Sequence, residues 1–241
     1  MRQTAVSNKQ KKPTMSKDFT AFVDDISWFI QKNDKVEIEE RTFELSNDFK
    51  NKFPKLTKLI ETSRKTFLRI NNVPHILFAW TNIYGEIFGW LNKIGDLENV
   101  SDKLCIEHKI LLQNIGGIQE FFNQPEDAIT NNKIFMFTGS ECSFGIGSWD
   151  EYYKKSCKEE NVDPIEHSNL ICFVEEANGN MTFYEQKTNE IILFAPDHCF
   201  EDITPIEGQP EYTFYKYENI ETFKNYVEKI AEEWIKENAS C

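Results

Sequence analysis

The 241-residue sequence contains little glycine or proline and no long apolar run. Ten glycines and eight prolines exclude collagen-like and low-complexity chains. The basic N-terminus is not followed by the apolar stretch of a secretory signal. The least charged stretch, residues 71–85, contains Pro74 and His75, and it is too short and too polar to cross a bilayer. We therefore expect a cytoplasmic protein that makes no membrane contact.

Motifs for metal binding and disulfide exchange are also missing. The six cysteines form no CxxC pair, and the four histidines are scattered. No HExxH, calcium-loop or Cys₂His₂ spacing occurs, so we expect no metal and no cofactor. Without a secretory signal, free thiols are the expected state of the cysteines.

Acidic residues outnumber basic residues in the chain after the N-terminus. The net charge is −13, but the first 17 residues carry +5, which leaves −18 for residues 18–241. A body this acidic repels phosphate backbones and favours encounter with basic partners, so we expect no nucleic-acid binding. Solubility alone is the alternative explanation of the acidity.

The chain divides into three parts. Residues 1–17 are polar and aperiodic and predict a disordered basic tail. Residues 18–99 predict a helical and aromatic elaboration of the same domain, with helices at 18–30 and about 55–67; the ring-rich stretch 78–90 fits either strand or helix. Residues 100–241 form the predicted core.

The signals for turns and helix ends are clearer in the predicted core. A helix that includes Leu104 and Leu111 is expected to end at Gly116 and Gly117, which we interpret as structural glycines. Strands at 170–175 and 181–185 flank Asn178-Gly179, a strong hairpin signal, and further strands are expected at 133–138, 191–195 and 212–217. A terminal helix runs to Trp234, with Asn219 as its expected cap. This order predicts an α+β fold: a mostly antiparallel sheet, with a meander near 170–195, flanked by helices.

Candidates for catalysis are weak. Gly145-Ile146-Gly147 lacks the third glycine and the lysine of phosphate loops and predicts a turn instead. His198 and Cys199 are adjacent, so in an extended chain they point to opposite faces. A thiol-dependent hydrolase that uses Cys199 or Cys142 with a distant histidine is the enzymatic alternative. We predict no catalytic residue.

A protein-binding surface is the remaining interpretation. Segment 201–241 holds ten acids against four lysines, and aromatic side chains near such acids can anchor a basic partner. Tyr153 and Tyr217 are further ring candidates, with burial in the core as the alternative for each ring. The predicted partner-binding residues are Trp149, Tyr152, Glu175, Glu176, Asp197, Glu201, Asp202, Glu211 and Tyr212.

The order of these motifs resembles a known family. A helix ending in Gly116-Gly117, then Gly147-Ser148-Trp149, a meander around Asn178-Gly179, and a terminal helix ending near Trp234 are similar to the SUKH superfamily, the cell-wall-assembly-regulator-like group. The similarity covers about residues 100–237. It implies a non-enzymatic α+β immunity protein that neutralises a toxin, often a nuclease. An intracellular regulatory scaffold without a toxin partner is the third hypothesis, and the sequence leaves the oligomeric state open.

Overall fold

Two antiparallel sheets and their covering helices make up the protein, which confirms the predicted α+β class. The computed structural model describes residues 16–95, 102–125, 129, 134–136, 142–197 and 202–240. Of the predicted tail, only Ser16 and Lys17 lie within these ranges. Both belong to the start of the first helix, where the Ser16 side chain accepts a hydrogen bond from the Phe19 amide.

The first sheet has the strand order β1-β2-β3-β4-β5. Its strands are β1 (Val36–Glu39), β2 (Arg64–Ile70), β3 (Val73–Thr81), β4 (Ile87–Lys93) and β5 (Gly117–Phe122). The ring-rich stretch 78–90 therefore consists of strands: it forms the β3–β4 hairpin. The elaboration expected to be helical contains β1 to β4 as well as helices, and pairing of β4 with β5 joins it to the predicted core.

The second sheet has the order β11-β12-β10-β9-β8-β6, and β7 also pairs with β8. The predicted hairpin and meander are confirmed, because β9 pairs with both β8 and β10. The strands are β6 (Ile134–Met136), β7 (Ser143–Phe144), β8 (Leu170–Glu176), β9 (Met181–Glu185), β10 (Ile191–Phe194), β11 (Ile203–Pro205) and β12 (Phe214–Tyr217).

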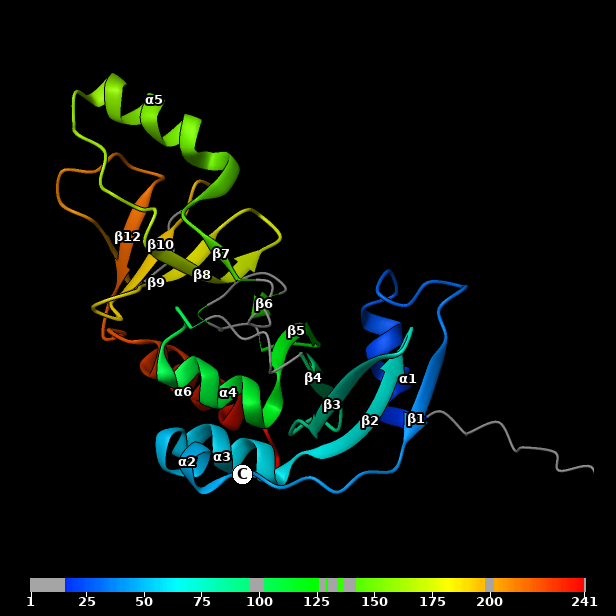
Figure 1. The fold of residues 1–241 in the computed structure, drawn as a ribbon. Coiled ribbons are helices and arrows are strands. Elements are labelled where there is room, and N and C mark those ends of the chain that lie inside the picture. The colour runs from blue at the N-terminus through cyan, green and yellow to red at the C-terminus, as the bar shows by residue number, and fades with distance from the viewer. Residues whose placement is uncertain are drawn as a thin grey trace, which may run out of the picture.

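Helices cover both sheets (Figure 1). They are α1 (Lys17–Asp25), α2 (Asn47–Lys52), α3 (Pro54–Thr62), α4 (Ile106–Ile115), α5 (Asp150–Glu160) and α6 (Phe223–Glu237), with a 3₁₀ turn, η2 (Gly147–Trp149), before α5. Figure 1 shows α4 and α6 on one side of the second sheet and α5 on the other. In the described parts of the chain, no helix combines the length and apolarity needed to cross a membrane.

The end of α4 and the start of α6 can be compared with their predictions. Gly116 ends α4 with φ of +73°, as predicted, and a side chain there would collide with the Lys93 carbonyl; Gly117 begins β5. The predicted cap Asn219 is wrong, because Thr222 caps α6. The Ile191 amide bonds to the Glu221 carbonyl, which keeps the chain extended beyond residue 219.

The helix predicted for residues 55–67 ends earlier, at Thr62. Phe67 belongs instead to β2, where it pairs with Glu39 on one side and Ile76 on the other. Strand partners from both sides satisfy the backbone of this segment, and these long-range bonds override the local helical pattern.

Helix α6 links the two sheets within one apolar core. Near its start, Phe223 and Tyr226 pack against Phe173 of the second sheet, with ring centroids 5.0 and 5.2 Å away. Near its end, the Trp234 ring packs on four aromatic side chains of the first sheet, Trp80, Phe88, Trp90 and Phe121.

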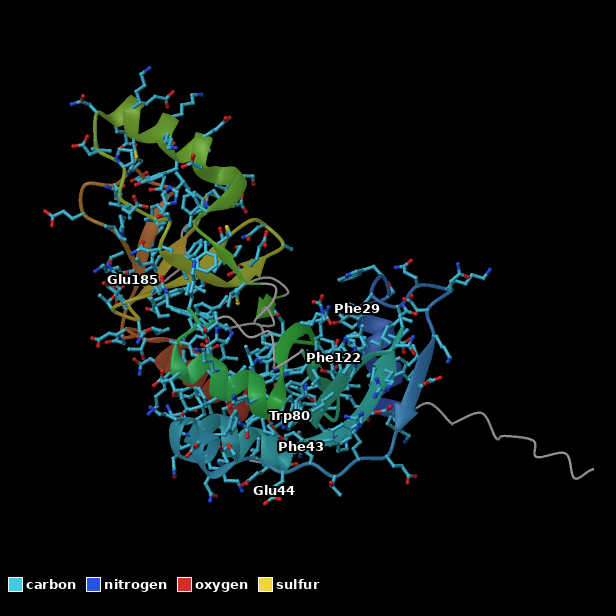
Figure 2. The ribbon with its side chains drawn as sticks, in the orientation of Figure 1. Phe29, Phe43, Glu44, Trp80, Phe122 and Glu185 are labelled. Atoms are coloured by element: carbon cyan, nitrogen blue, oxygen red, sulfur yellow. The ribbon has the colours of Figure 1, made fainter. Side chains whose placement is uncertain are left out.

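Smaller apolar clusters lie beneath α1 and α5. Phe122 packs against Phe22 of α1, on the face of the first sheet opposite Trp80; both Phe122 and Trp80 are labelled in Figure 2. Beneath α5, Tyr153 packs against Phe194 and Phe214 of the second sheet. Each face of each sheet is therefore covered by apolar packing.

Candidate protein-binding site

One end of the second sheet brings three separate segments together. Strand pairing places Met181 of β9 beside Phe194, and Phe194 beside Phe214. Three segments therefore meet at the same end of the sheet: the turn after β8, the end of β10 and the chain before β12. These segments, residues 175–180, 195–197 and 210–213, contain four acids and no basic residue. The resulting surface is negatively charged.

Trp149 reaches this end of the sheet from another part of the chain. Residue 149 ends η2, and α5 starts immediately after it. The Trp149 ring contacts Phe194 at 6.2 Å and lies against the hairpin turn, where a methyl group placed on Gly179 would come within 2.8 Å of the indole. Gly179 has φ of +89°, which glycine adopts without strain. The missing side chain also leaves room for the Trp149 indole.

Two tyrosines extend the aromatic surface. The Tyr152 ring meets Trp149 edge-on, at 5.7 Å and 79°, which is a favourable aromatic geometry. The Tyr152 hydroxyl donates to the Tyr212 carbonyl at 3.5 Å. Residues Tyr152 and Tyr212 remain 37% and 43% exposed. The structure thus unites the three ring residues predicted from the sequence.

Tyr212 is held in an unusual backbone conformation. Its φ is +59°, which a non-glycine residue adopts only when its surroundings compensate. Its amide donates to the Tyr215 hydroxyl at 2.7 Å, and Tyr215 is buried. This bond anchors the backbone, so the Tyr212 ring stays at the surface.

Helix α5 is fixed beneath the rings by Tyr153. This side chain is fully buried, and its hydroxyl accepts a hydrogen bond from the Ile165 amide at 2.8 Å and donates to the Gln209 side chain. Burial raises the pKa of Tyr153. At the start of α5, hydrogen bonding from Lys154 lowers the pKa of Asp150. Asp150 is therefore ionised at neutral pH, and it already has a cationic partner.

We define the sheet-end surface as Trp149, Tyr152, Tyr212 and the three exposed acids Glu175, Asp197 and Glu211. Asn178 supports it: its side-chain oxygen accepts from the Asn180 amide at 3.1 Å within the turn. The surface combines aromatic side chains with exposed carboxylates at one end of the sheet.

Other predicted residues do not join this surface. Glu176 is 3% exposed, because its side chain points to the α6 face whereas Glu175 points outward. Asp202 lies at the opposite end of the sheet, where its carbonyl accepts from the Glu218 amide at 2.8 Å. Glu201 is outside the described residues. Tyr153 and Tyr217 belong to the core.

Three of the described thiols, Cys105, Cys157 and Cys172, are not activated as nucleophiles. Burial raises the pKa of Cys105 to about 11 and raises the pKa of Cys157 and Cys172 as well. These thiols are protonated at neutral pH, whereas a nucleophilic cysteine needs a lowered pKa. Cys142 is half-buried and precedes β7. His198 and Cys199 fall outside the described residues.

Metal ligands are likewise not gathered in the described ranges. No group of three or more His, Cys, Asp or Glu side chains there is placed to hold an ion. Comparison of the chain with family models, curated proteins and solved structures finds no match. The geometry of the sheet-end surface is therefore the basis for a functional proposal.

Proposed function

We propose that this chain is a non-enzymatic binding protein that neutralises a basic toxin, of the nuclease type, in the cytoplasm. The observation that carries the proposal is the convergence of Trp149, Tyr152 and Tyr212 at one acidic sheet end. The resemblance to SUKH immunity proteins points to the same class of function. In this role, the surface occupies the cleft with which a nuclease grips phosphate.

The energetics suit such a partner. Trp149 is half-buried, and Tyr152 and Tyr212 are exposed. Tryptophan and tyrosine are typical hot-spot anchors because they bury a large area with few rotatable bonds. The charge of −18 over residues 18–241 attracts a basic domain over a distance and accelerates encounter. Rings then determine how long the complex lasts, and carboxylates determine how fast it forms.

The test measures binding kinetics with a purified basic nuclease toxin, beginning with one encoded beside this gene. Trp149→Ala and Tyr152→Ala should each raise the dissociation rate about tenfold or more. Charge reversal at Glu175, Asp197 and Glu211 together should lower the association rate about tenfold and reduce its dependence on salt.

Matched controls lie on the first sheet and its helices. Trp28 is an exposed tryptophan (54%) far from the sheet-end surface in the fold, and Trp28→Ala should leave binding unchanged. Reversal of Glu37, Glu44 and Glu61 changes the net charge equally at other sites. Equal losses from both charge sets would reject a localised interface, and unchanged binding by both ring variants would reject the proposed function.

A further inference from the structure

A cleft of about 700 Å³ opens at the end of the first sheet, on elements that form no part of the sheet-end surface. It lies between the β3–β4 turn, the chain that leaves β5, and the last turn of α6. The residues that matter for its chemistry are Asn82, Tyr84, Glu86, Phe88 and Glu237.

The walls of the cleft are fixed relative to each other. Asn82 forms a β-bridge with Asn238, directly after α6, and the Ala239 amide donates to the Thr81 carbonyl at 3.0 Å. The Asn238 side chain also donates to the Thr62 hydroxyl at 3.2 Å. The hairpin turn and the end of α6 are thereby joined, so the cleft is largely pre-formed.

The turn uses its own amide groups internally. Asn82 Oδ1 accepts from the Tyr84 and Glu86 amides at 3.0 and 2.9 Å, and Asn82 Nδ2 donates to Glu86 Oε2 at 3.0 Å. Asn123 Nδ2 donates to the Ile87 carbonyl at 2.7 Å. These side-chain donors are therefore already committed to the turn and the strand end.

The walls of the cleft carry groups that can accept hydrogen bonds from a ligand. The carboxylates of Glu86 and Glu237 face the same cleft. The C-terminal end of α6 adds the negative end of a 15-residue helix. No cationic side chain occurs among the described residues that line it.

Aromatic surface accompanies these acceptors. Tyr84 is 79% exposed at the rim and Phe88 forms part of the wall. A ligand that suits this lining needs positive charge, several donors that diverge in one plane, and a face that stacks on a ring. A guanidinium has all three, whereas an ammonium lacks the planar fork and the stacking face.

We propose that this cleft binds the arginine side chain of a segment of another protein. Its guanidinium donates to Glu86 and Glu237, and its planar face stacks on the exposed Tyr84 ring. This site is independent of the sheet-end surface.

Titration of the full chain with acetyl-Gly-Arg-Gly-amide, followed by calorimetry or NMR, tests the proposal. The expected Kd is about 1 mM or tighter, with acetyl-Gly-Lys-Gly-amide bound at least about fivefold more weakly. Glu86→Gln and Glu237→Gln should each weaken arginine binding about tenfold. Both substitutions keep the side-chain shape, and the new amide oxygen at position 86 can still accept from Asn82, so these variants should fold.

Control variants separate the alternatives. Glu44→Gln, at a remote site, and Trp149→Ala, at the sheet-end surface, should bind the peptide as the wild type does. Absence of saturable binding, or equal affinity for the lysine peptide, would overturn the proposal. Arg2→Gln in the full chain tests the source of the arginine: unchanged affinity supports a foreign segment, whereas a gain assigns the cleft to this chain's own Arg2 and overturns the choice of partner.

Discussion

The indole of Trp149 lies directly against the α-carbon of Gly179, where a Cβ atom would come within 2.8 Å of its Cζ2. Residues 30 positions apart in the chain thus form one contact, between the start of α5 and the β8–β9 turn. Because Trp149 also supports Tyr152, this contact determines where two of the three surface rings lie.

Gly179→Ala should displace Trp149 and weaken partner binding. We expect a loss of about 2–3 kcal/mol in the free energy of unfolding, from left-handed backbone strain plus collision with the indole. Gly208→Ala is the control: Gly208 has φ of +72°, but no atom of the described residues lies within 4 Å of its added methyl group. Gly208→Ala should lower the free energy of unfolding only by the cost of left-handed backbone strain, about 1–2 kcal/mol. Urea unfolding measures both, and equal losses would contradict the contact.

Glu228 caps a helix other than its own. Its carboxylate, on α6, accepts from the Lys55 and Leu56 amides, both at 3.0 Å, at the start of α3, where Phe53 provides no side-chain cap. Glu228→Ala should reduce the free energy of unfolding by about 1–2 kcal/mol. Glu232→Ala, which removes an exposed ion pair with Lys55, should change it by less than about 1 kcal/mol. If denaturation experiments gave similar losses in the free energy of unfolding for Glu228→Ala and Glu232→Ala, the stabilising effect of Glu228 would not come from the helix cap.

Adjacent acids on α6 should respond to pH in opposite directions. Burial raises the pKa of Glu233 above 4.5, so its contribution to stability is present below that pH and is lost as pH rises through the folded-state pKa. Hydrogen bonding from Lys55 lowers the pKa of Glu232, so its contribution is present above 4.5 and is lost on acidification.

The free energy of unfolding, measured by urea denaturation from about pH 3 to pH 7, tests this difference. Glu233→Gln should gain stability relative to the wild type as pH rises above 4.5. Glu232→Gln should lose relative stability as pH rises towards 4.5. Parallel curves for the two variants would contradict the assignment of burial to one carboxylate and pairing to the other.

Cys105 should alkylate slowly at neutral pH. With a pKa of about 11, only about one thiol in ten thousand is ionised at pH 7. Peptide-resolved labelling with iodoacetamide should show a rate that still rises between about pH 9 and pH 10, and urea should accelerate labelling at pH 8. Rapid modification of Cys105 in the folded protein at pH 7 would contradict the buried environment.

Local signals predicted the elements whose partners are near in sequence. Asn178-Gly179 predicted the β8–β9 hairpin, because the turn conformation that it favours brings adjacent strands into register. The apolar stripe ending at Trp234 predicted α6, although Thr222 rather than Asn219 caps it. In both cases the short-range physical preference agrees with the final packing.

Features that depend on contacts between residues far apart in the sequence could not be predicted correctly from local patterns. Phe67 continues a helical pattern, but β1 and β3 hold it in a strand. Glu176 was placed on the surface, because no local pattern shows which of two consecutive acids faces α6. The cleft beside Glu86 is not predicted by any local pattern, since long-range contacts such as the bridge between Asn82 and Asn238 bring Glu237 to it.

The position of α6 in the chain has a consequence for biosynthesis. Its Phe223 and Tyr226 complete the packing of one sheet, and its Trp234 completes that of the other, yet all three leave the ribosome after both sheets. Until then, Trp80 and Trp90 lack their common covering ring. The nascent chain therefore exposes aromatic surface until α6 has left the ribosome, and this interval is the one in which it depends most on chaperones.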